Sequence, residues 1–367
     1  MDNEHLGREP AGRHDTGEVR TSAHVRNTLI VFAIGAVFVG VGALLWQASQ
    51  VLLLVFAGTL VAILLQDAGR QLQRLLPVSE KAAMLMVLAL ALIVLVVGVW
   101  LLAPRVADEI GQLWDQLPAA WQNLRDYMEG NPVLRHLTRW MPEPGQLMSR
   151  APAVAAQAGN IFTGVLGGLA DFVVIFFVSV YLALQPQPYM RGIIRLVPPR
   201  RRARAREVLH ELGETLTYWL RGKLLSMLVI GVSTGVGLYL LGVPLALALG
   251  VVAGVLDFIP YIGPILAALP AVLIGFSEGL HPALYVVLLF VALQNMEGYL
   301  LLPLVERRTV ALPPALNVTM QILLGVPFGL IGVALATPLT AVLIVLVEML
   351  YVQDTLEDPV ALPTERH

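Results

Sequence analysis

Long apolar runs separated by short polar connections dominate the sequence. Residues 28–66 contain no charged side chain and divide at the polar patch 47–50 into two runs, and residues 82–104 and 161–184 supply two more. Each run provides the roughly 20 residues that a helix needs to cross a hydrocarbon core of about 30 Å. The pattern therefore predicts three spans within residues 28–104 and a fourth over 161–184.

Prolines and glycines interrupt the apolar pattern in the second half, at residues 260–264 and at Pro327 and Pro338. Backbone groups that such interruptions free from a helix must find partners in neighbouring helices or in a water-lined cavity. Ordinary kinked helices would explain the pattern, and so would broken or re-entrant helices, which gather at the substrate sites of transporters. We expect residues 224–352 to form a transmembrane transport core, which gives an all-α, polytopic integral membrane protein of about eight transmembrane helices.

The polar connections predict an orientation. Residues 185–223 hold the densest group of arginines and show helical spacing of apolar residues, so the positive-inside rule places this amphipathic helix and the N-terminus in the cytoplasm. The arginines from Arg200 to Arg206 would then lie on the anionic inner leaflet. Residues 105–160 would be external and also show helical spacing, as a cap packed on the membrane domain or as a partner-binding surface. Residues 1–27 and 353–367 are predicted to be disordered tails.

Composition narrows the function classes. Charged residues make up only 14% of the 367 residues against 57% hydrophobic, which indicates a bilayer rather than water as the solvent. The net charge of −2 gives no support to binding of nucleic acid, and the absence of cysteine excludes disulfides and thiolate metal sites. No HExxH, Walker A or dinucleotide-binding motif occurs, and the histidines form no cluster in sequence. We therefore expect neither an enzyme nor a cofactor or metal site.

Three acidic residues lie inside the apolar blocks away from their ends: Asp171, Asp257 and Glu297. No lysine or arginine lies inside these blocks to pair with them. A carboxylate at membrane depth is costly, so each should be protonated, hydrated or bound to a cation. Asp171 follows a glycine-rich stretch that is typical of close helix packing, which makes it a secondary candidate.

Polar and helix-breaking residues around two of these acids define the predicted substrate or ion pathway. Asp257 opens a helix-break pattern, and Glu297 shares a helical face with Gln294. A buried polar network without a ligand would look similar. The predicted pathway residues are Asp257, Pro260, Tyr261, Gly263, Pro264, Asn295, Glu297, Asn317 and Gln321.

Several motifs in order along residues 27–351 resemble the autoinducer-2 exporter family, also called PerM-type permeases. They are Arg-Leu-Val-Pro at 195–198, Tyr-Trp-Leu-Arg-Gly at 218–222, Gly-Val-Pro at 242–244, Ile-Pro-Tyr-Ile-Gly-Pro at 259–264, then Asn295, Glu297, Tyr299, Pro303 and a later series with Pro313, Gly325, Gly332 and Pro338. The chain departs from the family at Lys223, where glutamine is common, and at Asp257, where an uncharged residue is common.

The resemblance implies a bacterial inner-membrane protein of about eight spans that forms homo-oligomers, with a pentamer as one such state. It also implies secondary transport, either export of an autoinducer-2-like signal or exchange of Na⁺ or Li⁺ for H⁺. The alternative hypothesis is a membrane scaffold or regulatory protein that binds partners through its external and cytoplasmic helical segments.

Overall fold

The computed structural model describes residues 17–130, 171–301 and 312–358, and within these ranges the chain is helical with no strand. The chain divides into two compact units, Met1–Leu52 and Leu53–His367. The described part of the first unit is the beginning of α1 (Gly17–Leu75), and the other described helices belong to the second unit. The N-terminal tail was expected to extend to residue 27, but α1 already begins at Gly17.

The prediction of an all-α, polytopic membrane protein is confirmed. The described residues hold 5 helices that are long and apolar enough to cross a membrane, or 6 if the bent pair Asp171–Leu184 and Pro186–Arg195 forms one span. The expected break at the polar patch 47–50 is wrong for the described helix, because α1 continues through it. Residues 161–170 of the fourth predicted span lie outside the described residues.

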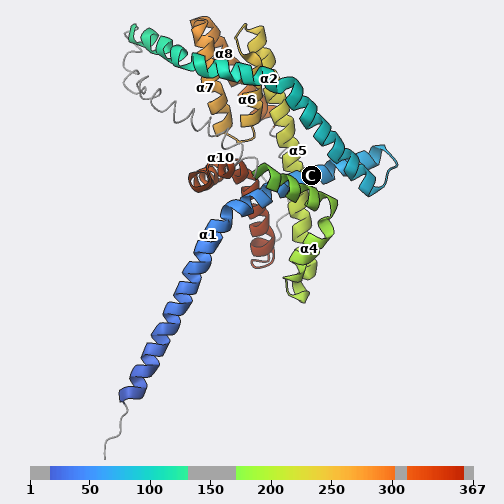
Figure 1. The fold of residues 1–367 in the computed structure, drawn as a ribbon, viewed down its shortest axis with the longest axis vertical. Coiled ribbons are helices and arrows are strands. Elements are labelled where there is room, and N and C mark those ends of the chain that lie inside the picture. Colours follow the sequence, from blue (N-terminus) through green and yellow to red (C-terminus); the bar gives the residue numbers. More distant parts are fainter. Residues whose placement is uncertain (1–16, 131–170, 302–311, 359–367) are drawn as a thin grey trace, which may run out of the picture. The chain divides into compact units, whose positions relative to one another are not determined.

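Helix α2 (Glu80–Gly130) continues through Pro104 and Pro118 into the segment that was expected to be external. Figure 1 shows that α2 bends and then crosses α6 and α7, which it contacts. Leu113 is buried there, and the carboxylate of Glu109 accepts a hydrogen bond of 2.8 Å from the backbone N–H of Ala248 in the first turn of α6. Residues 105–130 therefore pack on the helices beside them, as a cap would. Residues 131–160 lie outside the described ranges.

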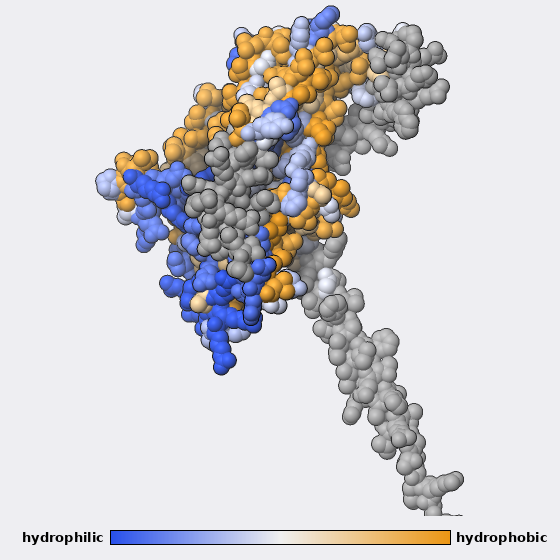
Figure 2. Space-filling model, turned by 180° about the vertical axis from the view of Figure 1, so that it is seen from behind, coloured by the Kyte–Doolittle hydropathy of each residue, from blue (hydrophilic) through white to orange (hydrophobic). Residues whose placement is uncertain are grey.

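The predicted Arg-rich helix over 185–223 is three elements: α4 (Pro186–Arg195), η2 (Pro199–Arg201) and the first half of α5 (Arg202–Leu240). Within it Arg204 is engaged by the protein, because its guanidinium donates to Gln353 at 2.7 Å and forms an ion pair of 2.9 Å with Asp354. Arg200, Arg201 and Arg206 are exposed. Figure 2 shows hydrophilic side chains gathered around α4 and the start of α5, beside a broad apolar surface.

The C-terminal part contains two interrupted helical segments. Helices α6 (Ala246–Leu256) and α7 (Ile262–Ser277) have 11 and 16 residues, which gives lengths of about 17 and 24 Å, short of a bilayer core. Helix α10 (Pro314–Leu346) is broken at Gly329, whose φ of 59° and ψ of −140° are not helical. The remaining elements are α8 (Leu280–Met296), the π-helix η3 (Glu297–Leu301) and the π-helix η4 (Val347–Gln353). The α6–α7 turn is a true break and Gly329 interrupts α10, whereas Pro338 lies inside the helix without a break.

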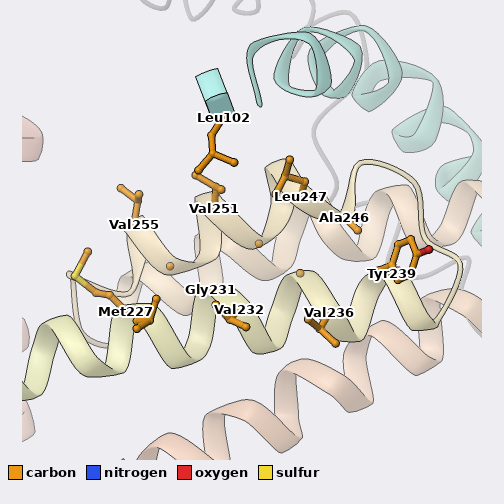
Figure 3. A pocket seen from close by; sticks show the side chains of 14 residues that line it. Leu102, Met227, Gly231, Val232, Val236, Tyr239, Ala246, Leu247, Val251 and Val255 are labelled. Carbon is orange, nitrogen blue, oxygen red and sulfur yellow. The ribbon is translucent and has the colours of Figure 1, made fainter. Parts of the chain in front are cut away.

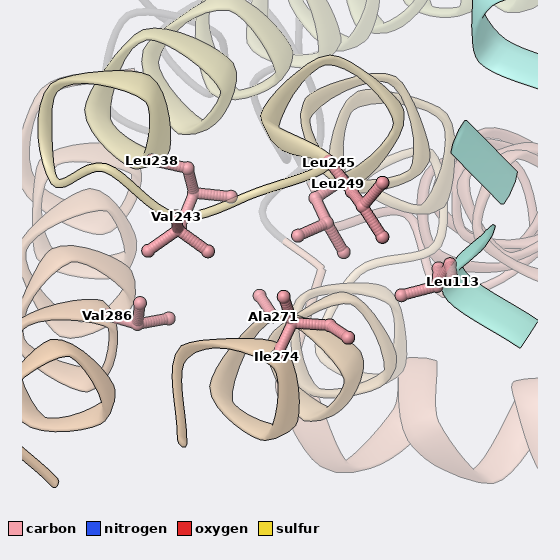
Figure 4. Packing of buried hydrophobic residues seen from close by; sticks show 8 residues of the cluster. All are labelled: Leu113, Leu238, Val243, Leu245, Leu249, Ala271, Ile274 and Val286. Atoms are coloured by element: carbon pink, nitrogen blue, oxygen red, sulfur yellow. The ribbon is translucent and has the colours of Figure 1, made fainter. Parts of the chain in front are cut away.

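Packing fixes α6 and α7 firmly. Side chains from α2, α5, α6, α7 and α8 and from the loop after α5 converge in one buried cluster (Figure 4): Leu113, Leu238, Val243, Leu245, Leu249, Ala271, Ile274 and Val286. Helices α5 and α6 approach so closely that a Cβ on Gly250 would lie 2.7 Å from the Cα of Gly235. Small residues at a helix crossing allow this approach inside a membrane. An apolar groove of about 720 Å³ follows the same seam (Figure 3).

A charged contact ties the end of α1 to α5. The carboxylate of Asp67 accepts hydrogen bonds from Nε and Nη2 of Arg221. Asp67 is 7% exposed and also accepts a hydrogen bond of 2.9 Å from Gln71. We expect Asp67→Asn to lower the free energy of unfolding by about 1 kcal/mol, because Arg221 is half exposed and regains water. Thermal unfolding in detergent measures this loss. Glu80→Gln, at the exposed start of α2, is the control, and equal effects of both changes would contradict the prediction.

Candidate functional site

Three charged side chains meet where α5, the end of α6 and the end of α8 come together. The ammonium group of Lys223 lies 3.1 Å from Oδ2 of Asp257 and 3.4 Å from Oε1 of Glu297. Asp257 is 1% exposed and Lys223 is 8% exposed. We call these three residues the acid–lysine cluster. Two carboxylates share a single ammonium group, so the ionised cluster carries one net negative charge.

Local helix structure positions the cluster. Lys223 and Ser226 are three residues apart on α5 and therefore share a face. The hydroxyl of Ser226 donates to Oε1 of Glu297 at 3.1 Å, and Nε2 of Gln294 donates to Oε2 at 3.3 Å. Glu297 begins the π-helix η3, an irregularity that is frequent at functional sites. Asp257 caps the C-terminal end of α6, where the helix dipole disfavours an anion and a nearby cation is needed.

Lys223 corrects one expectation. The sequence predicts no basic partner for the acids, because the apolar run begins after residue 223 and Lys223 is the last residue of the predicted cytoplasmic segment. Instead α5 runs unbroken from Arg202 to Leu240 and places Lys223 at the level of Asp257 and Glu297. A lysine at the boundary of an apolar run can reach inward, because its long apolar stem is buried at low cost.

The break between α6 and α7 is a tight turn centred on Tyr261. Its φ of 67° and ψ of −53° are those of a γ-turn, and the N–H of Ile262 donates to the carbonyl of Pro260 at 2.8 Å. This conformation is rare for a residue with a side chain and is strained. The turn also requires glycine at position 263, because a Cβ there would lie 1.8 Å from the carbonyl oxygen of Leu256. The predicted helix break therefore exists, and its geometry depends on Tyr261 and Gly263.

Gln321 connects the two interrupted segments. It is fully buried on α10, and its Nε2 donates to the carbonyl of Pro260 at 3.1 Å. Its Oε1 is buried and has no hydrogen-bond partner among the described residues. Asn317, one turn earlier, instead accepts a hydrogen bond of 3.0 Å from Thr337, beyond the break in α10. The predicted polar pair is therefore divided, since Gln321 belongs to the α6–α7 turn and Asn317 closes α10 on itself.

A small cavity adjoins the cluster. Its volume is about 20 Å³, and its lining includes Thr234 of α5, Pro264 of α7, Gln294 and Glu297. Thr234 is 0% exposed, and its hydroxyl has no hydrogen-bond partner in the described part of the chain. A cavity of this size holds about one water-sized particle. The cavity beside Glu297 thus has room for a single water molecule or small ion.

Other predicted residues lie apart from the cluster. Asn295 is exposed, and its amide donates at 2.7 Å to the carbonyl of Val291 on its own helix, so the expected convergence with Glu297 is wrong. Tyr261 acts through its backbone, and its side chain is 43% exposed. Asp171 is partly buried on the helix Asp171–Leu184, which contributes no residue to the cluster.

Besides Lys223, the residues Ser226 and Thr234 of the site were not predicted. Their signal was faint, since Ser226 is an isolated hydroxyl residue in an apolar run and Thr234 follows Ser233 within the same run. Residues 231–235 also read Gly-Val-Ser-Thr-Gly and so fit the GxSxG pattern of hydrolases, contrary to the expectation that the chain carries no enzyme motif. This pentapeptide lies in the middle of α5, not between a strand and a helix, and its glycines face α6. Among the described residues no group of three or more His, Cys, Asp or Glu could hold a metal ion.

Sequence comparisons agree with a transport class. YueF of Bacillus subtilis (strain 168), which carries the name of a transport protein, is 28% identical over 223 residues, which cover 60% of this chain and 58% of YueF. PerM of Escherichia coli (strain K12), which carries the name of a permease, is 27% identical over 255 residues, covering 62% of this chain and 71% of PerM. The chain thus spans less than two thirds of the length of YueF.

The fold and the site define a polytopic α-helical membrane protein whose buried charges gather at interrupted helices. The model of the AI-2E family transporters matches residues 28–351. The chain belongs to this family, as the motifs of the sequence indicated.

Proposed function

We propose that this protein is a secondary transporter that moves a small solute such as an autoinducer-2-like signal, or Na⁺ or Li⁺, in exchange for H⁺ across the bacterial inner membrane. The observation that carries the proposal is the acid–lysine cluster, where the buried carboxylate of Asp257 and the partly buried carboxylate of Glu297 face one ammonium group beside a broken helix. The N-terminus and the arginines around Arg200 would lie in the cytoplasm, against anionic lipids.

The charge of the cluster supports coupling to a cation. Burial of an uncompensated negative charge costs several kcal/mol, so the cluster gains stability whenever it takes up one proton or one monovalent cation. A group that gains and loses one positive charge in different states of a transporter can couple the driving ion to the solute. The γ-turn at Tyr261 and the break at Gly329 would be the places where the backbone changes between the states that alternating access requires.

The family and the names of the relatives support transport but not a particular solute. Assembly into homo-oligomers such as a pentamer belongs to the same proposal. The broad apolar surface of the second unit gives a second copy or lipid a face to cover (Figure 2).

Flux through purified protein in proteoliposomes tests the proposal. We expect the wild-type protein to move ²²Na⁺, Li⁺ or autoinducer-2 when a pH gradient is imposed, and Glu297→Gln to reduce that flux at least tenfold. The amide keeps the shape and the contact with Ser226 but cannot carry the charge. Glu278→Gln, in the turn between α7 and α8, is the matched control. No flux of any of the three by the wild-type protein, or wild-type flux by Glu297→Gln, would contradict the proposal.

A further inference from the structure

We propose that the small cavity beside Glu297 is a binding site for one dehydrated monovalent cation, and that the ammonium group of Lys223 competes with this cation for Glu297. This inference rests on the proposed function and deepens it, because it gives the monovalent cation of the proposed exchange a binding site and an internal competitor.

The size of the cavity decides which ligand class fits. A volume of about 20 Å³ accommodates about one water-sized particle, so Na⁺, Li⁺ or a hydronium ion fits and an organic solute does not. Any organic solute must therefore bind elsewhere on the pathway. The size of the cavity therefore assigns it to a small cation and not to an organic solute.

The available donors are oxygens, which hard cations prefer. Glu297 contributes a carboxylate to the lining, and Thr234 contributes a hydroxyl that is fully buried and has no partner among the described residues. A buried hydroxyl without a partner is costly, and a bound cation or water would remove that cost. Gln294 completes the polar part of the lining.

The charge balance favours a monovalent ion. Asp257, Glu297 and Lys223 sum to one negative charge when ionised, and one added monovalent cation brings the buried cluster to neutrality. A divalent ion would leave one positive charge buried. Among the described residues, these three are the charged side chains joined in the cluster, while the neighbouring Arg221 is bound by Asp67.

Lys223 is the internal competitor because it shares a ligand with the cavity. Its ammonium group lies 3.4 Å from Oε1 of the same carboxylate that lines the cavity. Two positive charges this close repel each other strongly in a medium of low dielectric constant. Binding of the cation therefore draws Glu297 from Lys223 and leaves Lys223 to Asp257, 3.1 Å away.

Binding of ²²Na⁺ to purified protein in nanodiscs tests the inference directly, with Li⁺ as a competitor. We expect Thr234→Val to weaken binding about tenfold through loss of one oxygen donor, and Glu297→Gln to abolish it. Lys223→Gln should instead bind Na⁺ about tenfold more tightly, because the competing charge is gone. Thr217→Val on the same helix, whose hydroxyl already donates to the carbonyl of Gly213, and Lys81→Gln, an exposed lysine, are the matched controls.

Unchanged affinity in Thr234→Val, or weaker binding in a folded Lys223→Gln protein, would overturn the inference. So would the absence of any saturable ²²Na⁺ binding by the wild-type protein, which would mean that the cavity holds only water. The Thr234→Val arm leaves the acid–lysine cluster intact and stays decisive if Lys223→Gln does not fold. Binding as predicted without flux would refute the proposed function alone, whereas flux without Na⁺ binding would refute this site alone.

Discussion

Lys223→Met is expected to lower the free energy of unfolding by about 3–5 kcal/mol, the cost of leaving a buried charge without its partner. Without the ammonium group, Asp257 and Glu297 face each other beside an apolar side chain, and Asp257 is only 1% exposed. Neutralising one acid should restore most of the loss, so the double variant Lys223→Met with Asp257→Asn should unfold within about 1–2 kcal/mol of wild type. Transport should be lost in both variants.

Thermal unfolding in detergent, combined with proteoliposome flux, measures both effects. Lys81→Met is the control for loss of a lysine as such, since Lys81 is exposed at the start of α2. A double variant as unstable as Lys223→Met would show that Lys223 stabilises the protein by packing rather than by charge. Full transport by the double variant would show that transport does not require the acid–lysine cluster.

Gly263→Ala is expected to cost more than about 4 kcal/mol, a loss reached only when a substitution conflicts with fixed backbone. The added Cβ would lie 1.8 Å from the carbonyl oxygen of Leu256, and neither atom belongs to a flexible side chain. Relief requires α6 and α7 to separate, which would displace Asp257 and the γ-turn. We therefore expect loss of both stability and transport.

Gly213→Ala supplies the matched control. Gly213 lies within α5, and a Cβ there would meet nothing within 4 Å. Alanine in an open helical position should stabilise the protein by about 0.5–1 kcal/mol. Both substitutions add one methyl group, so any difference in thermal unfolding or flux between the two variants comes from the position of the glycine. A Gly263→Ala protein with wild-type unfolding temperature would contradict the described turn.

The class of fold could be predicted from the sequence because run length and charge depletion depend on the bilayer alone. Asp257, Glu297 and the break around Pro260 could also be predicted, since acids and helix breakers stand out within an apolar run. Lys223 could not be assigned to the site, because a pattern marks where a run ends but not how far a long side chain reaches. Thr234 and Ser226 gained meaning only from the neighbours that α6 and α8 supply.

The same limit explains the outcome for Asn295 and Gln321. Both are amides in apolar surroundings, and the sequence gives no measure of which helical face is turned inward. The π-helix that begins at Glu297 alters the register just after Asn295, which is left exposed. Gln321 faces the α6–α7 turn because α10 passes beside it, a relation between segments about 60 residues apart that periodicity does not contain.

The carbonyl of Pro260 has two tasks at once. It closes the γ-turn by accepting from Ile262, and it holds Gln321 of α10. One oxygen atom therefore accepts both the hydrogen bond that closes the turn and the hydrogen bond from α10. A displacement of α10 must either move the α6–α7 turn or break the hydrogen bond between Gln321 and Pro260. Either event changes the backbone three residues from Asp257. The α6–α7 turn and α10 are therefore linked through one carbonyl oxygen, close in sequence to the carboxylate of Asp257.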